Sequence, residues 1–334
     1  MKEAGIPYTV FDQVDPEPGL KLADSGCAIA KKDKCDCVVG AGGGSAMDIA
    51  KAVSILMTNG GKAADYLGLG KIKKPGLAKI MIPTTAGTGS EVSFTAVFIN
   101  EETKSKGGMN GDPLYPEAAI LDPELTLSMP SHVTAATGID ALTHAIESYL
   151  SIQANPMSEM YSLTAIEMIS RNLPLAYANG KNLKARYNML LGSLLAGKGL
   201  ALAGVGLVHA MAYPLGGMFG VPHGLANAVL LPYVLDYSLI GAPEKYADIA
   251  HAMGKNTDKL DLREAASLAV EAVYTLNREV GIPPNLGLLD IKEEHLPEMA
   301  RVALTITRPV ENNPRQPTLE EVVQVYQESI RGWE

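Results

Sequence analysis

The chain has 334 residues, of which 47% are hydrophobic and 19% are charged, and its formal net charge is −9 at pH 7. This length suits two domains or one large one, and the low share of charged residues indicates extensive buried surface, as in a homodimer or higher homo-oligomer. The acidic balance, with no long basic run, argues against a nucleic-acid partner and against an anionic membrane surface.

Targeting and redox features of the sequence point to the cytoplasm. No apolar run approaches the roughly 20 residues of a membrane span, and the N-terminal stretch MKEAGIPYTVFD lacks the apolar core and cleavage site of a signal peptide. Cys27, Cys35 and Cys37 form an odd, closely spaced set, which argues against a disulfide framework. We therefore expect a cytoplasmic protein with reduced thiols and no membrane partner.

The first part of the chain alternates short β-rich runs with helical stretches. The patterns predict helices over 20–32 and 45–57, and strands over 6–12, 36–44, 77–85, 93–100 and 117–123. Such alternation predicts an α/β domain over residues 1–127, built on an open, largely parallel sheet flanked by helices.

The rest of the chain lacks strand patterns and shows long segments of helical periodicity, separated by Pro and Gly. Helices are predicted over 131–151, 156–173, 182–202, 205–219, 224–238, 243–253, 262–280, 293–304 and 318–331. The sequence therefore predicts a second, all-helical domain over residues 128–334.

A glycine-rich loop joins the predicted strand 36–44 to the predicted helix 45–57. In VVGAGGGSAMDIAK, four of the five residues from Gly40 to Gly44 are glycines, and Ser45 suits an N-cap position. Glycines let the backbone approach a ligand, and a helix N-terminus offers N–H groups and a positive dipole end. A tight turn needs only one or two glycines, so the loop favours a phosphate or pyrophosphate cradle. The Walker lysine pattern is absent, which disfavours phosphoryl transfer.

A second polar loop, PTTAGTGSE over 83–91, follows the predicted strand 77–85. Its hydroxyl side chains are Thr84, Thr85, Thr88 and Ser90. Two such loops at strand ends fit the crevice in which open α/β sheets bind ligands.

Four residues of the helical part form a candidate metal site. Asp140 and His144 are four positions apart, on one face of the predicted helix 131–151. His209 and His223 lie in the apolar run GVGLVHAMAYPLGGMFGVPHG, where an imidazole is costly unless its nitrogens find partners. Taken singly, the carboxylate could pair with a cation and each imidazole could bond a backbone carbonyl. Together they suit Fe2+, Zn2+ or a similar first-row metal, without the thiolates of a structural zinc site.

Five motifs in order carry a family resemblance: GGGSAMDIAK, PTTAGTGSE, DPELT, GIDALTHAIESY and HAMAYPLGGMFGVPHG. They resemble the iron-dependent (group III) alcohol dehydrogenases, a family that includes lactaldehyde reductases, propanediol dehydrogenases and butanol dehydrogenases. The resemblance implies a Rossmann-like dinucleotide-binding domain and an all-helical metal-binding domain, with the cofactor in the cleft. The family pattern also carries an earlier βα unit, which we expect to be missing from this chain.

The resemblance also implies the roles of individual residues. It assigns Fe2+, with Zn2+ as the alternative, to Asp140, His144, His209 and His223, and NAD, with NADP as the alternative, to the α/β domain. The implied cofactor contacts are Gly42, Gly43, Gly44 and Ser45 at the pyrophosphate, Asp48, Thr84, Thr85 and Gly87 on the nicotinamide side, and Lys106 at a ribose. Where many relatives have a further histidine near the nicotinamide, this chain has Tyr213, whose phenol suits a catalytic role in positioning or proton relay.

The implied reaction is reversible hydride transfer between NAD(P) and a small primary aliphatic alcohol or diol, with its aldehyde as the other partner. The apolar segment around His209 contains no arginine to hold a charged substrate. Two alternatives stay open. One is a glycerol dehydrogenase-like or dehydroquinate synthase-like metalloenzyme, although the fourth ligand favours the iron group. The other is a truncated metal- and nucleotide-binding remnant without turnover.

Overall fold

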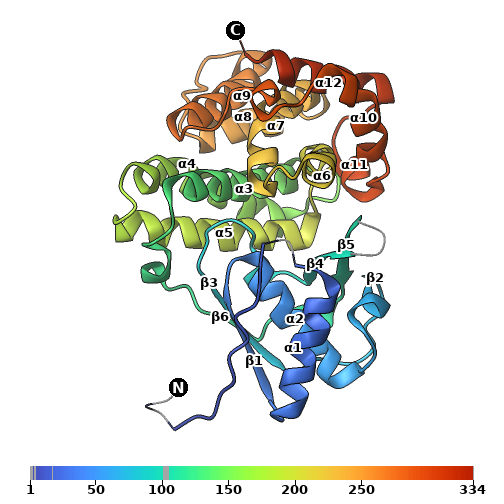
Figure 1. Ribbon diagram of the computed structural model, residues 1–334. Coiled ribbons are helices and arrows are strands. Elements are labelled where there is room, and N and C mark those ends of the chain that lie inside the picture. The colour runs from blue at the N-terminus through green and yellow to red at the C-terminus, as the bar shows by residue number, and fades with distance from the viewer. Residues whose placement is uncertain (1–2, 4, 17, 101–104, 334) are drawn as a thin grey trace. The chain divides into compact units, whose positions relative to one another are not determined.

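The computed structural model describes residues 3, 5–16, 18–100 and 105–333, and the chain divides into two compact units (Figure 1). Unit 1 comprises Met1–Thr85 and Ser90–Asp122, and unit 2 comprises Ala86–Gly89 and Pro123–Glu334. The strands lie in the blue and teal part of the chain in Figure 1, and the long helices of unit 2 lie in the green to red part. An α/β unit followed by a helical unit is the predicted fold class, which is confirmed.

The parallel sheet of unit 1 has the strand order β1 (Cys37–Gly42), β3 (Ala78–Pro83) and β6 (Ala118–Ala119). Helix α2 (Gly44–Asn59) packs against β1 and β3, and α1 (Leu20–Lys32) packs against α2. Gly40 explains how closely α2 approaches: a Cβ there would lie 2.7 Å from Met81 Sδ and 2.8 Å from Ala50 Cβ. The predicted strands 36–44, 77–85 and 117–123 and the two predicted helices are confirmed, with β6 shorter than expected.

A second sheet of unit 1 departs from the prediction. Strand β4 (Thr95–Asn100) is antiparallel to β5 (Ser105–Asn110), and β2 (Gly68–Leu69) pairs in parallel with β5. The strand predicted over 93–100 is confirmed as β4, but its place in a largely parallel sheet is wrong, because β4 pairs in antiparallel with the next stretch of chain. The sequence of β5, SKGGMN, has no hydrophobic alternation, so its pattern gave no sign of a strand.

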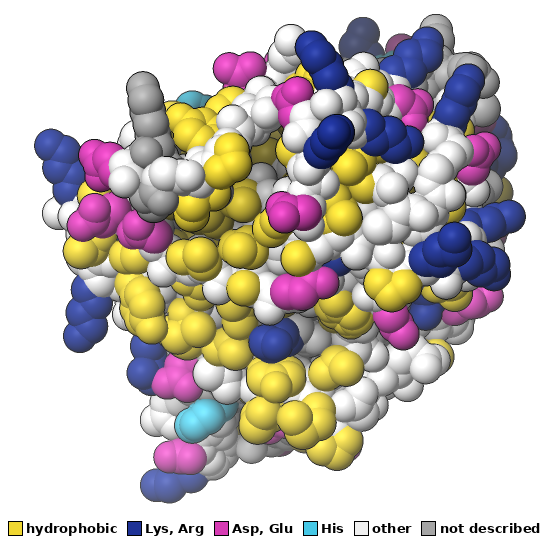
Figure 2. Space-filling model, turned by 90° about the horizontal axis from the view of Figure 1, so that it is seen from below, with side chains coloured by type: hydrophobic (Ala, Val, Ile, Leu, Met, Phe, Trp, Pro, Cys, Tyr) yellow, Lys and Arg dark blue, Asp and Glu magenta, His cyan; other side chains and the backbone are white. Residues whose placement is uncertain are grey.

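The predicted strand over 6–12 is also wrong, since these residues form no strand. Ile6, Tyr8 and Val10 are 52%, 52% and 67% exposed, so the alternating side chains do not face a core. A strand needs a neighbour for its backbone hydrogen bonds, and no described strand pairs with this segment. Apolar side chains are in fact widespread on the face that Figure 2 shows.

Unit 2 consists of helices, and all nine predicted helices are present, with ends shifted by a few residues. They are α3 (Ser131–Leu150), α4 (Pro156–Ala178), α5 (Leu183–Ala203), α6 (Leu207–Phe219), α7 (His223–Ser238), α8 (Pro243–Ala252), α9 (Leu262–Glu279), α10 (Leu296–Leu304) and α12 (Leu319–Arg331). The short helix α11 (Thr307–Asn312) was not predicted, because its six residues are too few for a periodic pattern. Helix α3 packs against α4, α5 and α7, and α6 packs against α7 and α10.

Helix α7 is mostly apolar. The stretch His223–Gly241 is long and apolar enough to cross a membrane by length and composition, contrary to the expectation that no run approaches that length. However, 61% of its apolar window is buried inside the protein, and α7 packs against α3, α6 and α9. This burial is typical of a core helix.

Candidate metal centre and nucleotide loop

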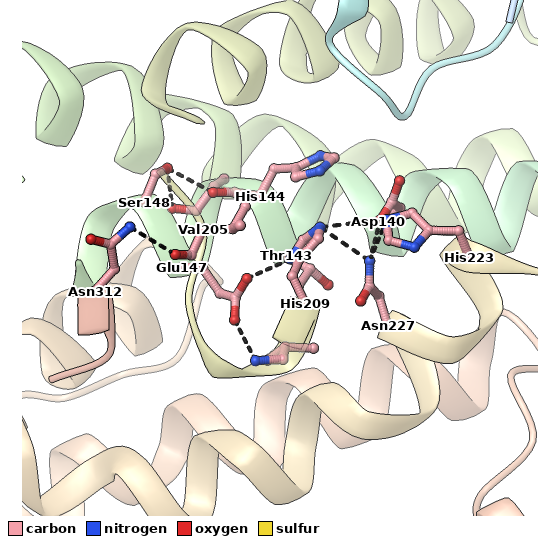
Figure 3. Close-up of polar contacts among 12 residues, drawn as sticks. Asp140, Thr143, His144, Glu147, Ser148, Val205, His209, His223, Asn227 and Asn312 are labelled. Carbon is pink, nitrogen blue, oxygen red and sulfur yellow. Dashed lines mark hydrogen bonds and ion pairs between the residues drawn. The ribbon is translucent and has the colours of Figure 1, made fainter. Parts of the chain in front are cut away.

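Three helices of unit 2 bring a carboxylate and two imidazoles together (Figure 3). Asp140 lies on α3, His209 on α6 and His223 on α7, and one ligand atom from each lies within 4.8 Å of the other two. Asp140 Oδ1 is 3.9 Å from Nε2 of His209 and 3.9 Å from Nε2 of His223. Asp140 and His209 are buried, whereas the His223 side chain is 35% exposed. The structure therefore brings together three of the four predicted ligands.

The chain between His209 and His223 explains how these two residues meet. His209 is the third residue of α6, and His223 is the first residue of α7. Helix α6 ends at Phe219, the left-handed backbone of the next residue, Gly220 (φ +67°), turns the chain, and Pro222 precedes the first residue of α7. Each histidine therefore lies in the first turn of a helix.

Asn227 lies between the three ligand atoms. Its Nδ2 is 2.7 Å from Asp140 Oδ1, 3.1 Å from His209 Nε2 and 3.2 Å from His223 Nε2. The three acceptors thus point at one positively polarised group, while the buried Oδ1 of Asn227 has no partner among the described residues. Such converging acceptors, with an unsatisfied amide oxygen beside them, fit a divalent cation with nitrogen and oxygen ligands.

His144, the fourth predicted ligand, lies beside this group but outside the three converging atoms. Its ring stacks on that of His209 with centroids 4.8 Å apart, and its Nδ1 is 3.3 Å from the carbonyl oxygen of Gly87. A histidine that donates its Nδ1–H to a carbonyl keeps the Nε2 lone pair for a metal. The role of His144 as a ligand stays a prediction.

Glu147 is a polar residue of this centre that the sequence analysis missed. Its Oε2 is 2.5 Å from His209 Nδ1, and its Oε1 accepts the backbone N–H of Val208 at 2.6 Å (Figure 3). Glu147 lies three positions after His144, and Asn227 lies four positions after His223. Helical spacing from the predicted ligands was therefore a signal for both residues.

Charges in the centre shift two pKa values. Burial alone would raise the pKa of Asp140, but the three imidazoles and the Asn227 amide more than offset burial, and the pKa is lowered. Burial opposes the charge of His209, but the Glu147 carboxylate overrides it and raises the pKa of His209. Asp140 is thus kept in the ionised form that a metal requires.

Tyr213, the predicted catalytic residue, stands next to the centre. Its ring meets that of His223 edge-on, with centroids 6.4 Å apart. Burial raises the pKa of the Tyr213 phenol above its ordinary value of 10, so the hydroxyl stays protonated at neutral pH. This hydroxyl makes no hydrogen bond to the part of the chain that the structure describes.

The glycine-rich loop of unit 1 joins β1 to α2 as predicted, but its helix begins one residue earlier. Gly43 is the N-cap and Gly44 the first helical residue, so the assignment of Ser45 as N-cap is wrong. A Cβ on Gly42 would lie 2.6 Å from Ala46 Cβ, whereas one on Gly43 would lie 3.5 Å from Thr85 Oγ1. Position 42 needs glycine because a side chain would clash with Ala46, and Gly43 leaves the backbone uncovered at the start of the helix. These features fit a bound phosphate group.

Other predicted cofactor residues are distributed over both units. Thr84 and Thr85 follow β3, and the Thr84 N–H donates to the Gly42 carbonyl at 2.9 Å, so the two predicted loops of unit 1 are in contact. Lys106 lies on β5 opposite Ile99, and Gly87 belongs to unit 2.

Asp48, also predicted on the nicotinamide side, is engaged inside unit 1. Its Oδ1 accepts the Ser90 hydroxyl at 2.6 Å, and its Oδ2 accepts the Val97 N–H at 2.9 Å. The Lys51 ammonium is 3.9 Å from Oδ1. The structure thus gives this carboxylate a role within the fold, and a role toward the cofactor stays a prediction.

Unit 1 thus carries a bare strand-to-helix loop, and unit 2 gathers a carboxylate and imidazoles that could hold a metal ion. Comparisons with known proteins name the family. Residues 1–123 match the family model "Iron-containing alcohol dehydrogenase", and residues 134–330 match "Fe-containing alcohol dehydrogenase family, C-terminal". The chain belongs to the iron-containing alcohol dehydrogenase family.

Individual relatives agree with this assignment. The chain is 44% identical to 1,3-propanediol dehydrogenase of Citrobacter freundii. The match extends over 330 residues, which are 99% of this chain and 85% of that protein. It matches a crystal structure of 1,3-propanediol oxidoreductase with a TM-score of 0.96 at 42% identity, over 98% of this chain and 86% of that one. It also matches sulfoacetaldehyde reductase from Bifidobacterium kashiwanohense, solved with NAD+, with a TM-score of 0.88 at 32% identity, over 96% and 83% of the two chains.

Proposed function

We propose that this protein is a metal-dependent alcohol dehydrogenase that interconverts a small primary alcohol or diol and its aldehyde with NAD as the second substrate. The observation that carries the proposal is the convergence of Asp140, His209 and His223 on one point of unit 2. Family membership supports the reaction class, because the similar proteins are named as alcohol and propanediol dehydrogenases.

The proposed metal ligands are Asp140, His144, His209 and His223, with Fe2+ as the native ion. One carboxylate and three imidazoles suit this ion as well as Zn2+, and the family model that matches residues 1–123 is named for iron. When bound, the cation would supply Lewis acidity toward the substrate oxygen, and the nicotinamide ring would accept or return the hydride.

The chain's own side chains hold and orient the reacting groups. Asp140 supplies a negative charge in a buried setting, where electrostatic interactions are strong. The partly exposed side of the centre is at His223, beside the Tyr213 phenol. A protonated phenol there can donate a hydrogen bond to the substrate oxygen, which orients the alcohol or aldehyde.

The proposed cofactor site begins at the glycine loop, with Gly42, Gly43, Gly44 and Ser45 at the pyrophosphate. Thr84 and Thr85 follow the adjacent strand, and their loop contacts the glycine loop through the Thr84 N–H. NAD rather than NADP is favoured by the similarity to a reductase that was solved with NAD+.

The proposed substrate is short and uncharged. The hydrogen bonds at Asp140, His144, Glu147 and His209 join carboxylates, imidazoles, an amide and backbone groups, and none of these bonds comes from a lysine or arginine. A carboxylate or sulfonate substrate would need such a cation. Apolar surroundings discriminate weakly between homologous alcohols, by about 1–3 kcal/mol per methylene.

The experiment that tests this function is a substrate panel. NADH formation is measured with Fe2+-loaded protein and with ethanol through hexanol, 1,2-propanediol, 1,3-propanediol and a hydroxy acid. We expect turnover with several short alcohols or diols and little with the hydroxy acid. Activity confined to the hydroxy acid, or none with any alcohol, would contradict the proposal.

Location in the cytoplasm and assembly into a homodimer belong to the same proposal. The three cysteines are free of disulfide bonds, as expected of a reducing compartment. The low share of charged residues supports a subunit interface. Light scattering of the purified protein measures the assembly directly.

A further inference from the structure

We propose that Glu147 is the positioning residue of the metal centre. One carboxylate both caps the helix that carries His209 and fixes the orientation of the His209 ring. The inference rests on the proposed function, since it gives Glu147 a role in binding the metal.

The first half of the role is a helix cap supplied from another helix. Helix α6 begins after Gly206, which has no side chain to cap it, and its first turn contains no acidic residue. The Oε1 of Glu147, 61 positions away on α3, accepts the N–H of Val208 at 2.6 Å instead. A Cβ on Gly206 would lie 3.1 Å from this same oxygen, so the glycine leaves room for the carboxylate. The negative charge also suits the positive end of the helix dipole.

The second half of the role concerns the imidazole. The other oxygen, Oε2, is 2.5 Å from His209 Nδ1. A carboxylate can only accept, so the proton of the ring stays on Nδ1 and the lone pair stays on Nε2. That lone pair faces the point where Asp140 Oδ1 and His223 Nε2 converge. The ring is also stacked on His144, which limits its rotation.

Burial shows why a capping role alone does not explain Glu147. The residue is 4% exposed, and removing a carboxylate from water is costly unless its oxygens are well bonded. A serine or asparagine at the N-cap would cap the helix without burying a charge. A carboxylate, by contrast, has two oxygens that can accept both bonds at once. Its two oxygens link the start of α6 and the ring of His209 into one unit.

The test is Glu147→Gln in the full chain, with Zn2+ alone as the probe. Glutamine has the same size but a single acceptor, so its amide N–H2 faces either the Val208 N–H or His209 Nδ1. Facing Nδ1, it would move the ring proton to Nε2, the nitrogen that the metal needs. We expect the Zn2+ Kd of metal-stripped protein, measured by chelator competition, to rise about 10- to 100-fold.

Tyr149→Phe is the matched control, because it removes a hydrogen bond to Asp248 from a neighbouring residue of α3. Both variants are expected to lower the Tm of the metal-stripped protein, but only Glu147→Gln to weaken Zn2+ binding. If Glu147→Gln does not fold, Glu147→Asp carries the test, since its shorter side chain cannot reach both donors and should also raise the Kd.

The outcomes separate this inference from the proposed function. A wild-type protein that binds no Zn2+ overturns the proposed function and the role of Glu147 with it. Tight wild-type binding, with an unchanged Kd in the folded Glu147 variant, overturns only the role of Glu147 and leaves it a helix cap.

Discussion

Three of the four proposed ligands of the metal centre are held by a second polar group. The Glu147 carboxylate accepts from His209, the Gly87 carbonyl lies at Nδ1 of His144, and the Asn227 amide donates to Asp140. Such partners set the tautomer and direction of a ligand before a metal arrives. At the scale of single residues, the site is therefore an ordered set of acceptors.

Tyr213 is the residue whose role in turnover is easiest to isolate. We expect Tyr213→Phe to lower kcat about tenfold, equal to about 1.4 kcal/mol, because the phenol's hydrogen bond to the substrate oxygen is lost. Steady-state kinetics on metal-loaded protein measure the change, and elemental analysis should find the metal content unaltered. An unchanged kcat would mean that the ring only fills space beside His223.

Gly43 separates the phosphate cradle from a simple turn. Its φ of −77° is open to any residue, and a Cβ there meets Thr85 Oγ1 at an ordinary 3.5 Å, so Gly43→Val should fold. The added branches cover the backbone that a pyrophosphate must approach. We expect at least a tenfold higher Kd for NAD by titration calorimetry, with normal metal content. An unaltered Kd for NAD would mean that the glycines serve only to form the turn and do not bind the pyrophosphate.

At the scale of elements, the loop Ala86–Gly89 is a part of unit 2 within the sequence of unit 1. The Gly87 carbonyl lies at Nδ1 of His144, and a Cβ on Gly89 would lie 2.5 Å from Gly197 Cα of α5. Gly89 also has a left-handed backbone, with φ +61°. Gly89 and Gly197 therefore allow the loop to pack directly against α5.

We predict that Gly89→Ala lowers the free energy of unfolding by about 2 kcal/mol or more, because both the backbone conformation and the contact with α5 become strained. The matched control is Gly217→Ala on α6, where a Cβ meets nothing within 4 Å and helix propensity improves. Urea unfolding of both variants gives the comparison. Equal stabilities would refute the close approach.

The elements differ in how far the sequence could predict them. The helices of unit 2 were predictable because most are long, repeat apolar residues at helical spacing, and are separated by Pro and Gly. Segment 6–12 has the alternation of a strand, but pairing depends on a neighbour that a local pattern does not contain. The start of α2 at Gly44 was missed because a Ser in the first turn looks like a cap.

The candidate site shows the same division. Asp140, His209 and His223 were predictable because titratable residues are costly in apolar segments. Asn227 and Glu147 were missed, since an amide or carboxylate on a helix is usually solvated. Their roles depend on how α3, α6 and α7 pack, and one helix's own pattern says little about that packing.

At the scale of the whole molecule, unit 1 buries several charged groups. The Lys51 ammonium donates to Ser90 Oγ, Ser93 Oγ and the Thr95 carbonyl at 2.8, 3.2 and 2.9 Å. Burial lowers the pKa of Lys51 to about 8 and raises that of Glu91 to about 7. Stability should therefore depend on pH in a way that one variant can reveal.

We predict that the wild type loses stability as the pH rises from about 4.5 to about 7, and that Glu91→Gln does not show this loss. The folded protein holds a proton on Glu91 that the unfolded chain, with a pKa of 4.5, releases earlier. This contribution to stability is complete below pH 4.5 and disappears as pH rises through about 7. At about 1.4 kcal/mol per pKa unit, the wild type should lose at most about 3 kcal/mol relative to the variant. Urea unfolding at both ends of this pH range measures the difference in free energy of unfolding. If that free energy changes equally with pH in the two proteins, Glu91 does not hold a buried proton.

The most direct test of the metal centre is the metal content of four variants purified anaerobically. Asp140→Ala, His209→Ala and His223→Ala each remove one converging ligand, whereas His132→Ala alters an exposed histidine at the start of α3. We predict about one Fe2+ per chain in the wild type and in His132→Ala, and little or none in the other three. Full metal content in all four variants would contradict the account.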